Sequence, residues 1–350
     1  MRAIDCDVHP FMPGLKTLEP YLDAYWREMV DVRGLETVES GSYPINSPLT
    51  CRPDWKREPR PASKLEDLAP HVFGQMGADI AILNSLYGIQ LMMNEDQAIA
   101  FARALNDWIK AEWLDRDPRL RASIVIPVQN VEHAVEEIER CAADPRFVQI
   151  LLLCMGEAPM GRRQFWPIYA AAQRLNLPIG IHVGSTYKNP VTSLGWPSWY
   201  LEDYVDQAGG FQSSLTSMIC EGAFAAHQDL RVVLLESGVS WLPGFMWRLG
   251  KFWRGLRFEV PWVKEAPMEI VRRHVRLTIQ PLDAPDDPQI VERLMNHFKS
   301  DEMFLYASDF PHWQFDGDDP MPPAVPQSMR QKIMVDNPLA TYTRLGALVQ

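Results

Sequence analysis

The residues best suited to chemistry are acidic and imidazole side chains at the ends of short apolar runs. They are Asp5, Asp7, His9, His182, Glu236 and Asp309. The first three alternate with other residues, and alternate residues of a strand share one face. Carboxylates and imidazoles bind divalent cations and transfer protons near neutral pH. These positions therefore predict a metal site or an acid-base site.

The elements that must position these groups follow a repeating order. Eight apolar runs predict strands at 3–9, 78–84, 122–127, 147–153, 178–183, 231–236, 275–280 and 303–308. Helical patterns follow them at 64–76, 96–115, 131–142, 162–175, 214–227, 241–252, 287–298 and 327–345. Eight strands, each followed by a helix, predict a parallel (β/α)8 TIM barrel. The alternative, a doubly wound Rossmann fold, usually has about six strands and a glycine-rich first turn, which this chain lacks.

In such a barrel, the carboxyl ends of the strands form the active-site face. Asp7, His9, His182, Glu236 and Asp309 would converge there, and a divalent cation is the most economical partner for several buried carboxylates. Each residue also has a structural interpretation, since His182 would suit a hydrogen-bonded core position and Asp309 would suit a turn before proline.

Other residues near the predicted barrel mouth are candidates for support or for substrate contact. Asp5 lies deeper on the first strand, where accepting hydrogen bonds behind the metal is more natural than direct ligation. His312 follows the last strand closely enough to touch a substrate. Tyr187 and Trp313 indicate a planar or apolar substrate body. Arg52 is the candidate for binding a substrate carboxylate, because its guanidinium offers two parallel donors.

Two long insertions follow strands and are expected to form lids over the catalytic face. One covers 34–63 and is rich in Pro, Ser and Gly, and the other covers 185–211 and is rich in aromatic residues. Loops at this face commonly close over substrate and exclude water. No linker separates domains, so residues 1–350 are expected to form one domain.

Charge and cysteine usage restrict the partners and the compartment. The formal charge of -11 disfavours nucleic acid and anionic membrane surfaces as partners. No apolar run is long enough to span a bilayer. The five cysteines show no CxxC spacing, which favours free thiols in the cytoplasm. A small-molecule substrate is expected, and the apolar helix faces are compatible with a homodimer.

Three segments resemble the amidohydrolase superfamily. They are Asp5-Cys6-Asp7-Val8-His9, Ile181-His182-Val183 and Ser308-Asp309-Phe310-Pro311-His312. The similarity is greatest to the amidohydrolase-related branch that includes aminocarboxymuconate semialdehyde decarboxylase and several aromatic-acid decarboxylases. It implies one divalent ion held by Asp7, His9, His182 and Asp309. The ligand types suit Zn²⁺ or Mn²⁺, and no lysine ends the fourth strand to hold a second ion.

Two departures from the family pattern bear on the reaction. Asp7 stands where the decarboxylases carry His or Glu, and Glu236 stands where they usually carry a catalytic His. An additional ionised carboxylate would repel a carboxylate substrate. We therefore expect hydrolysis of a small aromatic or cyclic carbonyl compound by metal-activated water, with Asp309 and Glu236 as acid-base groups. The alternatives are non-oxidative decarboxylation of an aromatic or unsaturated acid and a barrel that binds ligand without turnover.

Overall fold

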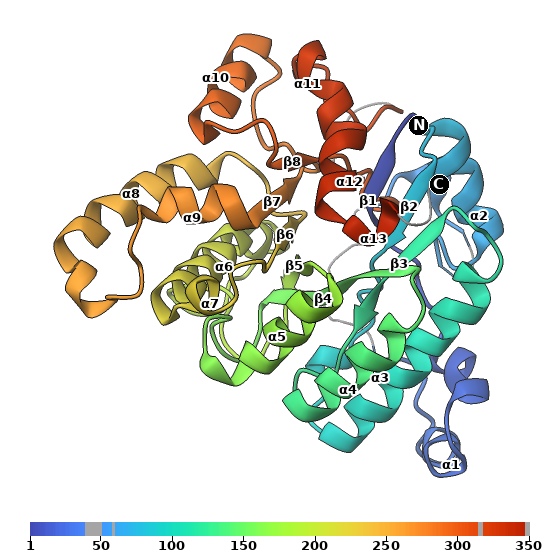
Figure 1. The fold of residues 1–350 in the computed structure, drawn as a ribbon. Coiled ribbons are helices and arrows are strands. Elements are labelled where there is room, and N and C mark those ends of the chain that lie inside the picture. Colours follow the sequence, from blue (N-terminus) through green and yellow to red (C-terminus); the bar gives the residue numbers. More distant parts are fainter. Residues whose placement is uncertain (39–50, 58–59, 314–317, 347–350) are drawn as a thin grey trace.

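A computed structural model describes residues 1–38, 51–57, 60–313 and 318–346. Eight strands lie side by side in chain order in one parallel sheet, which curls into a barrel (Figure 1). The strands are β1 (Ile4–Val8), β2 (Ile80–Leu83), β3 (Leu120–Val125), β4 (Phe147–Met155), β5 (Ile179–Ser185), β6 (Val232–Leu235), β7 (Val275–Thr278) and β8 (Phe304–Leu305). The predicted TIM barrel is confirmed, and all eight predicted strands are present.

The barrel closes where β8 meets β1. The backbone N–H of Cys6 donates to the carbonyl of Tyr306 over 3.0 Å, and the N–H of Asp309 donates to the carbonyl of Asp7 over 3.0 Å. A parallel bridge joins Val8 to Phe310. Closure therefore places the first and last strand ends, which carry predicted site residues, directly beside each other.

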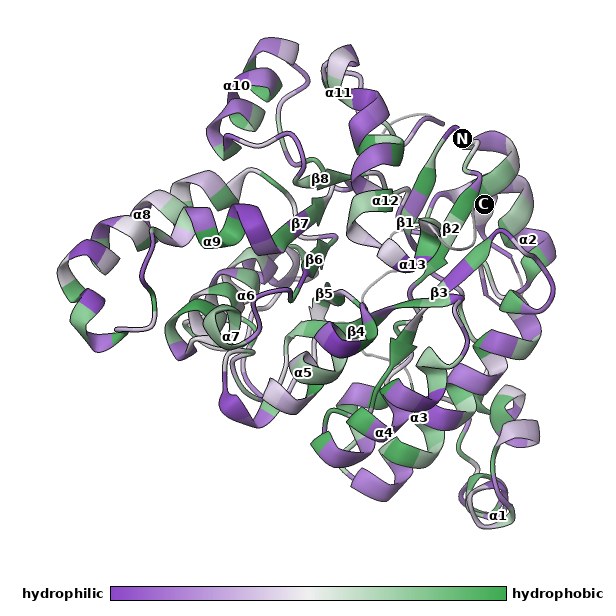
Figure 2. Ribbon diagram, viewed as in Figure 1, coloured by the Kyte–Doolittle hydropathy of each residue, from purple (hydrophilic) through white to green (hydrophobic). Residues whose placement is uncertain are grey.

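Helices surround the barrel (Figure 1). They are α1 (Ala24–Arg33), α2 (Leu65–Ala69), α3 (Glu95–Ile109), α4 (Val131–Ala142), α5 (Trp166–Leu175), α6 (Tyr200–Glu221), α7 (Ala223–Ala226), α8 (Trp241–Leu256), α9 (Pro267–His274), α10 (Pro288–Phe298), α11 (Gln327–Gln331), α12 (Asn337–Thr341) and α13 (Thr343–Gly346). Hydrophobic residues dominate the central strands, and the helices alternate polar and apolar residues (Figure 2). The helix α4 is typical: Ala134, Ile138 and Cys141 are buried at spacings of three or four, and the Asn130 side chain caps its first turn.

The two insertions differ from their predicted form. The predicted start of the helix at 214–227 is wrong, because α6 begins at Tyr200, inside the insertion at 185–211 that follows the end of β5 at Ser185. The Glu202 carboxylate starts this helix by accepting the backbone N–H of Trp199 over 2.8 Å. Of the insertion at 34–63, residues 39–50 and 58–59 lie outside the described part of the chain. Its described residue Cys51 pairs with His312, beside the end of β8. A lid function for either segment remains a prediction.

The closing helical segment is attached to the barrel by Asn337. Its side-chain amide donates to the carbonyls of Asp301 and Phe304 over 2.8 and 3.0 Å. The residue is helical and follows the π-helical turn Lys332–Asp336, so it does not cap a new helix. Its side-chain amide instead links the C-terminal helices to β8.

All five cysteines are free, and none of the described helices is long and apolar enough to cross a membrane.

Replacing Asn337 with Ala should destabilise the fold by about 1 to 3 kcal/mol, because buried carbonyl groups lose their donor. Urea unfolding would measure this loss. The control is Ser328→Ala on α11, which removes a hydroxyl from an exposed residue. Equal unfolding midpoints for the two variants would contradict this role for Asn337.

Candidate metal centre

Four predicted site residues come together at the carboxyl end of the barrel. Asp7 and His9 come from β1 and the residue just beyond it, His182 from β5, and Asp309 from the segment that follows β8. All four are at most 2% exposed. One ligand atom from each lies within 4.8 Å of the others. This spacing would allow one ion to contact all four.

The shortest distances join imidazole nitrogens to carboxylate oxygens. His9 Nε2 lies 2.9 Å from Asp309 Oδ1 and 3.2 Å from Asp7 Oδ1. His182 Nε2 lies 3.5 Å from Asp7 Oδ2. The ring centres of His9 and His182 are 4.9 Å apart and nearly perpendicular. Both imidazoles therefore direct Nε2 toward the aspartate carboxylates.

Unpartnered polar atoms show that the cluster suits a cation. Among the described residues, Asp7 Oδ2, His182 Nε2 and Asp309 Oδ2 are buried without a hydrogen-bond partner. A buried polar atom without a partner costs free energy. One divalent ion among these three strand ends would supply the missing partner of all three atoms. The donor set of two carboxylates and two imidazoles fits both Zn²⁺ and Mn²⁺.

Backbone carbonyls orient the two imidazoles. His9 Nδ1 lies 2.8 Å from the carbonyl oxygen of Asn84, and His182 Nδ1 lies 2.7 Å from that of Val183. A carbonyl can only accept, so Nδ1 carries a proton in both rings. Binding of a metal at Nε2 would require each ring in its neutral form, so the metal would replace a proton there.

The pKa values follow from burial and from charge pairing. Burial lowers the pKa of His9, but the charges of Asp7 and Asp309 outweigh burial and raise it well above its usual value. Burial raises the pKa of Asp309, but His312 and His9 outweigh it and lower the pKa below its usual value. Burial also raises the pKa of Asp7, but His9 and His182 outweigh it and lower the pKa well below its usual value. Both aspartates are therefore ionised at neutral pH, as cation binding requires.

Asp5 lies behind the cluster, as predicted. Its Oδ1 accepts the backbone N–H of Ser308 over 2.9 Å and that of Asp7 over 3.3 Å. It thereby joins β1 to the backbone just before Asp309. Burial raises the pKa of Asp5 to about 7. The carboxyl group supports the positions of neighbouring residues and does not belong to the cluster of four.

Glu236 faces the same cluster from the end of β6. Its Oε2 lies 3.5 Å from His182 Nε2, and the hydroxyl of Tyr204 donates to its carboxyl group. Burial and the nearby charge of Asp309 raise the pKa of Glu236 well above its usual value. Both effects favour the protonated, neutral form of Glu236.

Glu236 and Asp309, the acidic residues just beyond β6 and β8, have an unusual backbone conformation. Glu236 has φ of 54° and Asp309 has φ of 58°, in the left-handed region that non-glycine residues rarely adopt. Such strain concentrates at functional sites, where the surrounding structure maintains it. Here the Glu236 N–H donates to the Thr278 hydroxyl over 3.0 Å, and the Asp309 N–H donates to the backbone carbonyl of Asp7 over 3.0 Å.

The predicted substrate-contacting residues lie in different environments. His312 Nδ1 is 3.1 Å from Asp309 Oδ1, so His312 belongs to the cluster's rim. Tyr187 hydrogen-bonds Asp203, and Trp313 is 36% exposed. The Arg52 guanidinium is bound to Asp54 and Asp318 and lies over the Trp55 ring. Two carboxylates would therefore compete with a substrate for Arg52.

Sequence reasoning did not single out Tyr204 and Asn84. Tyr204 lies on the second turn of α6, inside the predicted insertion at 185–211, and reaches Glu236. Asn84 follows β2, and its amide donates to Asp7 Oδ1 over 2.8 Å. A polar residue at the end of the second apolar run was a usable signal for Asn84. Tyr204 had no comparable signal.

The fold and site define an enzyme of the amidohydrolase class. Residues 4–344 match the amidohydrolase family, and the chain belongs to that family. The prediction of one divalent-metal site in an amidohydrolase-type barrel is confirmed by the buried cluster and by neighbouring structures that contain manganese.

Particular relatives share this fold. Gamma-resorcylate decarboxylase of Rhizobium radiobacter is 24% identical over 203 residues, a match that spans 56% of this chain and 62% of the relative. A 2,6-dihydroxybenzoate decarboxylase complexed with 2,6-dihydroxybenzoate superposes with a TM-score of 0.68 at 18% identity, covering 97% of this chain and 99% of the other. A third structure is dihydroxybenzoic acid decarboxylase of Polaromonas sp. JS666 with bound manganese and 2-nitroresorcinol. It superposes with a TM-score of 0.66 at 18% identity and covers 97% of this chain and 96% of the other.

The prediction of hydrolysis is wrong. The three proteins just described are named as decarboxylases of aromatic acids. The prediction assumed that Glu236 is ionised and repels a carboxylate substrate. Burial and Asp309 instead raise its pKa and favour its neutral form, and Tyr204 donates to it, which weakens the basis for the assumed repulsion.

Replacing His182 with Ala should weaken divalent-metal binding by more than about 10-fold, because the cluster loses a direct donor. Isothermal titration with Mn²⁺ would measure the change. The control is His133→Ala, which removes an imidazole from the exposed face of α4. Unchanged Mn²⁺ affinity in the His182 variant would show that the ion binds elsewhere.

Proposed function

We propose that this protein is a metal-dependent, non-oxidative decarboxylase of an aromatic carboxylic acid. Asp7, His9, His182 and Asp309 would hold one divalent ion. The observation that carries the proposal is the buried cluster with three unpartnered ligand atoms, set in a barrel whose relatives are named as decarboxylases. The relative from Rhizobium is matched over less than two thirds of its length, so the substrate class is part of the proposal.

The ion would neutralise the substrate carboxylate and an adjacent oxygen, which places the acid over the cluster. The bond between the ring carbon and the carboxyl carbon then breaks, and carbon dioxide leaves with the carboxyl carbon and both oxygens. The electron pair left on the ring carbon takes a proton. Asp309, ionised in the resting site, would first accept a proton through His312, which lies 3.1 Å from its Oδ1, and would then pass that proton to the ring carbon.

Glu236 and Tyr204 would line the wall opposite β1. A protonated Glu236 offers a hydrogen bond without repelling the anionic substrate, and the Tyr204 hydroxyl holds its carboxyl group in place. Tyr200, one turn earlier on α6, has a pKa raised chiefly by burial. The first turns of α6 would therefore form a neutral, aromatic side of the substrate site.

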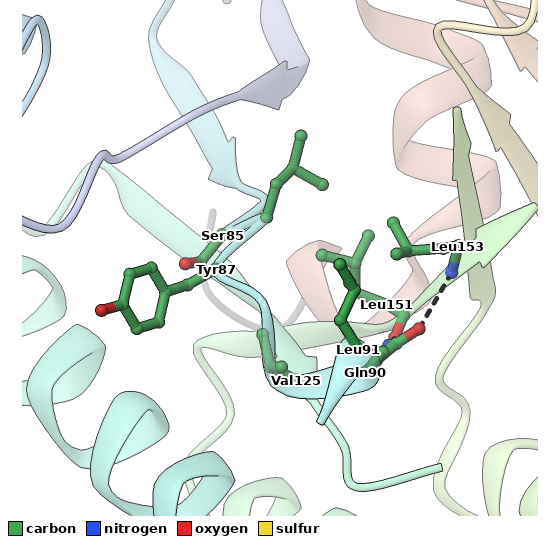
Figure 3. Close-up of a pocket in the computed structure, with 8 residues that line it drawn as sticks. Ser85, Tyr87, Gln90, Leu91, Val125, Leu151 and Leu153 are labelled. Atoms are coloured by element: carbon green, nitrogen blue, oxygen red, sulfur yellow. Dashed lines mark hydrogen bonds between the residues drawn. The ribbon is translucent and has the colours of Figure 1, made fainter. Parts of the chain in front are cut away.

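Several predictions from the sequence remain open. The single domain, the lids, the homodimer, the cytoplasmic location and substrate contacts by Arg52, Tyr187 and Trp313 are retained as proposals. The apolar pocket of Figure 3 lies beside the carboxyl ends of β2, β3 and β4 and adjoins Asn84 through Ser85.

Protein loaded with Mn²⁺ or Zn²⁺ should release carbon dioxide from at least one member of a panel of hydroxybenzoic acids that includes 2,6-dihydroxybenzoate. In D₂O, the product should carry one deuterium at the carbon that lost the carboxyl group. Mass spectrometry would detect the deuterium, and protein stripped of metal is the control. An acid product that contains oxygen from ¹⁸O-labelled water would refute decarboxylation.

Glu236→Gln should retain the metal and keep turnover within about threefold of wild type. A glutamine amide has nearly the shape of a protonated carboxyl group and still offers donor and acceptor atoms. Glu236→Ala, which removes the hydrogen-bonding group, is the comparison. A loss of about 10²-fold or more in the Gln variant would instead show that Glu236 transfers a proton during turnover.

A further inference from the structure

The interior of the barrel contains a layer of polar residues below the metal cluster. Asn84 follows β2, Ser123 lies in β3, Gln149 lies in β4, and Tyr342 lies between α12 and α13. All four are at most 2% exposed. Interiors of such barrels are usually filled by branched apolar side chains. Buried polar groups cost free energy unless they are hydrogen-bonded. Their presence in the barrel interior therefore suggests a function beyond packing.

The layer forms a continuous chain of hydrogen bonds that ends at a proposed metal ligand. The Tyr342 hydroxyl donates to Gln149 Oε1 over 2.9 Å. Gln149 Nε2 donates to Asn84 Oδ1 over 3.1 Å and to Ser123 Oγ over 2.8 Å. Ser123 Oγ in turn donates to Asn84 Oδ1 over 2.6 Å. Asn84 Nδ2 finally donates to Asp7 Oδ1 over 2.8 Å.

This chain has a direction. Because the Tyr342 hydroxyl donates to the Gln149 oxygen, the Gln149 amide nitrogen faces Asn84. Because two donors then meet the Asn84 oxygen, the Asn84 amide nitrogen faces Asp7. Each amide thus passes its orientation to the next. At the near end, the Asn84 amide nitrogen also donates to the backbone carbonyl of Cys6 over 3.2 Å, so the chain and this carbonyl together present the amide nitrogen to the carboxylate of Asp7.

The neighbouring strand makes room for the chain. A Cβ atom on Gly180 of β5 would lie 2.5 Å from Cδ and Nε2 of Gln149. That separation is far shorter than van der Waals contact, so any larger residue at position 180 would displace the Gln149 amide. Glycine in a buried strand interior weakens the strand but permits such a close approach.

We propose that Tyr342, Gln149 and Asn84 act as a positioning relay for the metal ligand Asp7, an inference that rests on the proposed metal site. The relay fixes Asp7 Oδ1 as the acceptor of the Asn84 amide. It thereby leaves Asp7 Oδ2, which has no hydrogen-bond partner among the described residues, directed toward His182 Nε2 at 3.5 Å. Metal affinity would then depend on a hydroxyl group in the C-terminal segment, which does not touch the metal cluster.

The test compares Mn²⁺ binding by two glutamine variants of the full-length protein. Gln149→Leu removes the centre of the relay while nearly preserving volume. Gln90→Leu is the matched control, since Gln90 is also buried and hydrogen-bonded, but only to the backbone of β4 (Figure 3). Both should destabilise the protein in urea unfolding. Only Gln149→Leu should weaken Mn²⁺ binding, by about 10-fold, the low end for residues that orient metal ligands.

Tyr342→Phe provides a second variant that keeps the packing and removes only the hydroxyl. It should weaken Mn²⁺ binding in the same direction by a smaller factor. Mn²⁺ affinity within twofold of wild type for both relay variants would overturn the proposal. Wild-type protein that binds no Mn²⁺ would refute the metal site itself. Wild-type protein that binds Mn²⁺ but releases no carbon dioxide would refute only the decarboxylase, and the relay would still be judged by the affinities.

Discussion

The structure depends on two ionised carboxylates buried next to each other where the barrel closes. Asp7 and Asp309 lie on neighbouring strand ends, their backbones are joined by a hydrogen bond, and neither is exposed to solvent. Like charges in a low-dielectric interior destabilise a fold unless positive charge or bound metal compensates them. His9 provides part of that compensation, because its Nε2 lies within 3.2 Å of a carboxylate oxygen of each aspartate.

Much of the local irregularity serves this arrangement. The pairing of β1 with β2 shifts by one residue between Asp5 and Val8, and such bulges redirect side chains near active sites. Glu236 and Asp309 adopt positive φ angles just after their strands. Asp5 then links the backbones of Asp7 and Ser308, which stabilises the two strand ends against each other. The strain and the polar burial are concentrated on the face where the chemistry would occur.

The state of Glu236 shows how the surroundings of a residue decide its function. An ionised glutamate at this position would favour a neutral substrate, and that assumption led to the incorrect prediction of hydrolysis. The buried site and the charge of Asp309 instead favour the protonated form, with Tyr204 as a hydrogen-bond donor. A protonated glutamate is a neutral hydrogen-bonding group, which an anionic aromatic acid can approach.

The sequence by itself determined the barrel and the residues that meet in the buried cluster at its mouth. Eight apolar runs predict eight buried parallel strands, and polar residues at their ends must meet at one face because parallel strands share a direction. This argument needs only the order of elements, so it located Asp7, His9, His182, Glu236 and Asp309 correctly at the barrel mouth. The start of α6 was not predicted. Its capping residue is Glu202, which accepts the backbone N–H of Trp199, and the aromatic residues around it do not form a recognisable helix-start pattern.

Only the tertiary structure decided which groups touch one another and which protons they hold. Gln149 appears in the sequence as a single polar interruption of an apolar run, yet it contacts Asn84 and Tyr342, 65 and 193 residues away. The pKa of Glu236 depends on Asp309 and on burial, and neither its surroundings nor its distance to Tyr204 follows from spacing along the chain. Hydrogen bonds and charge interactions act over a few ångströms in space, so their partners are known only when the chain is folded.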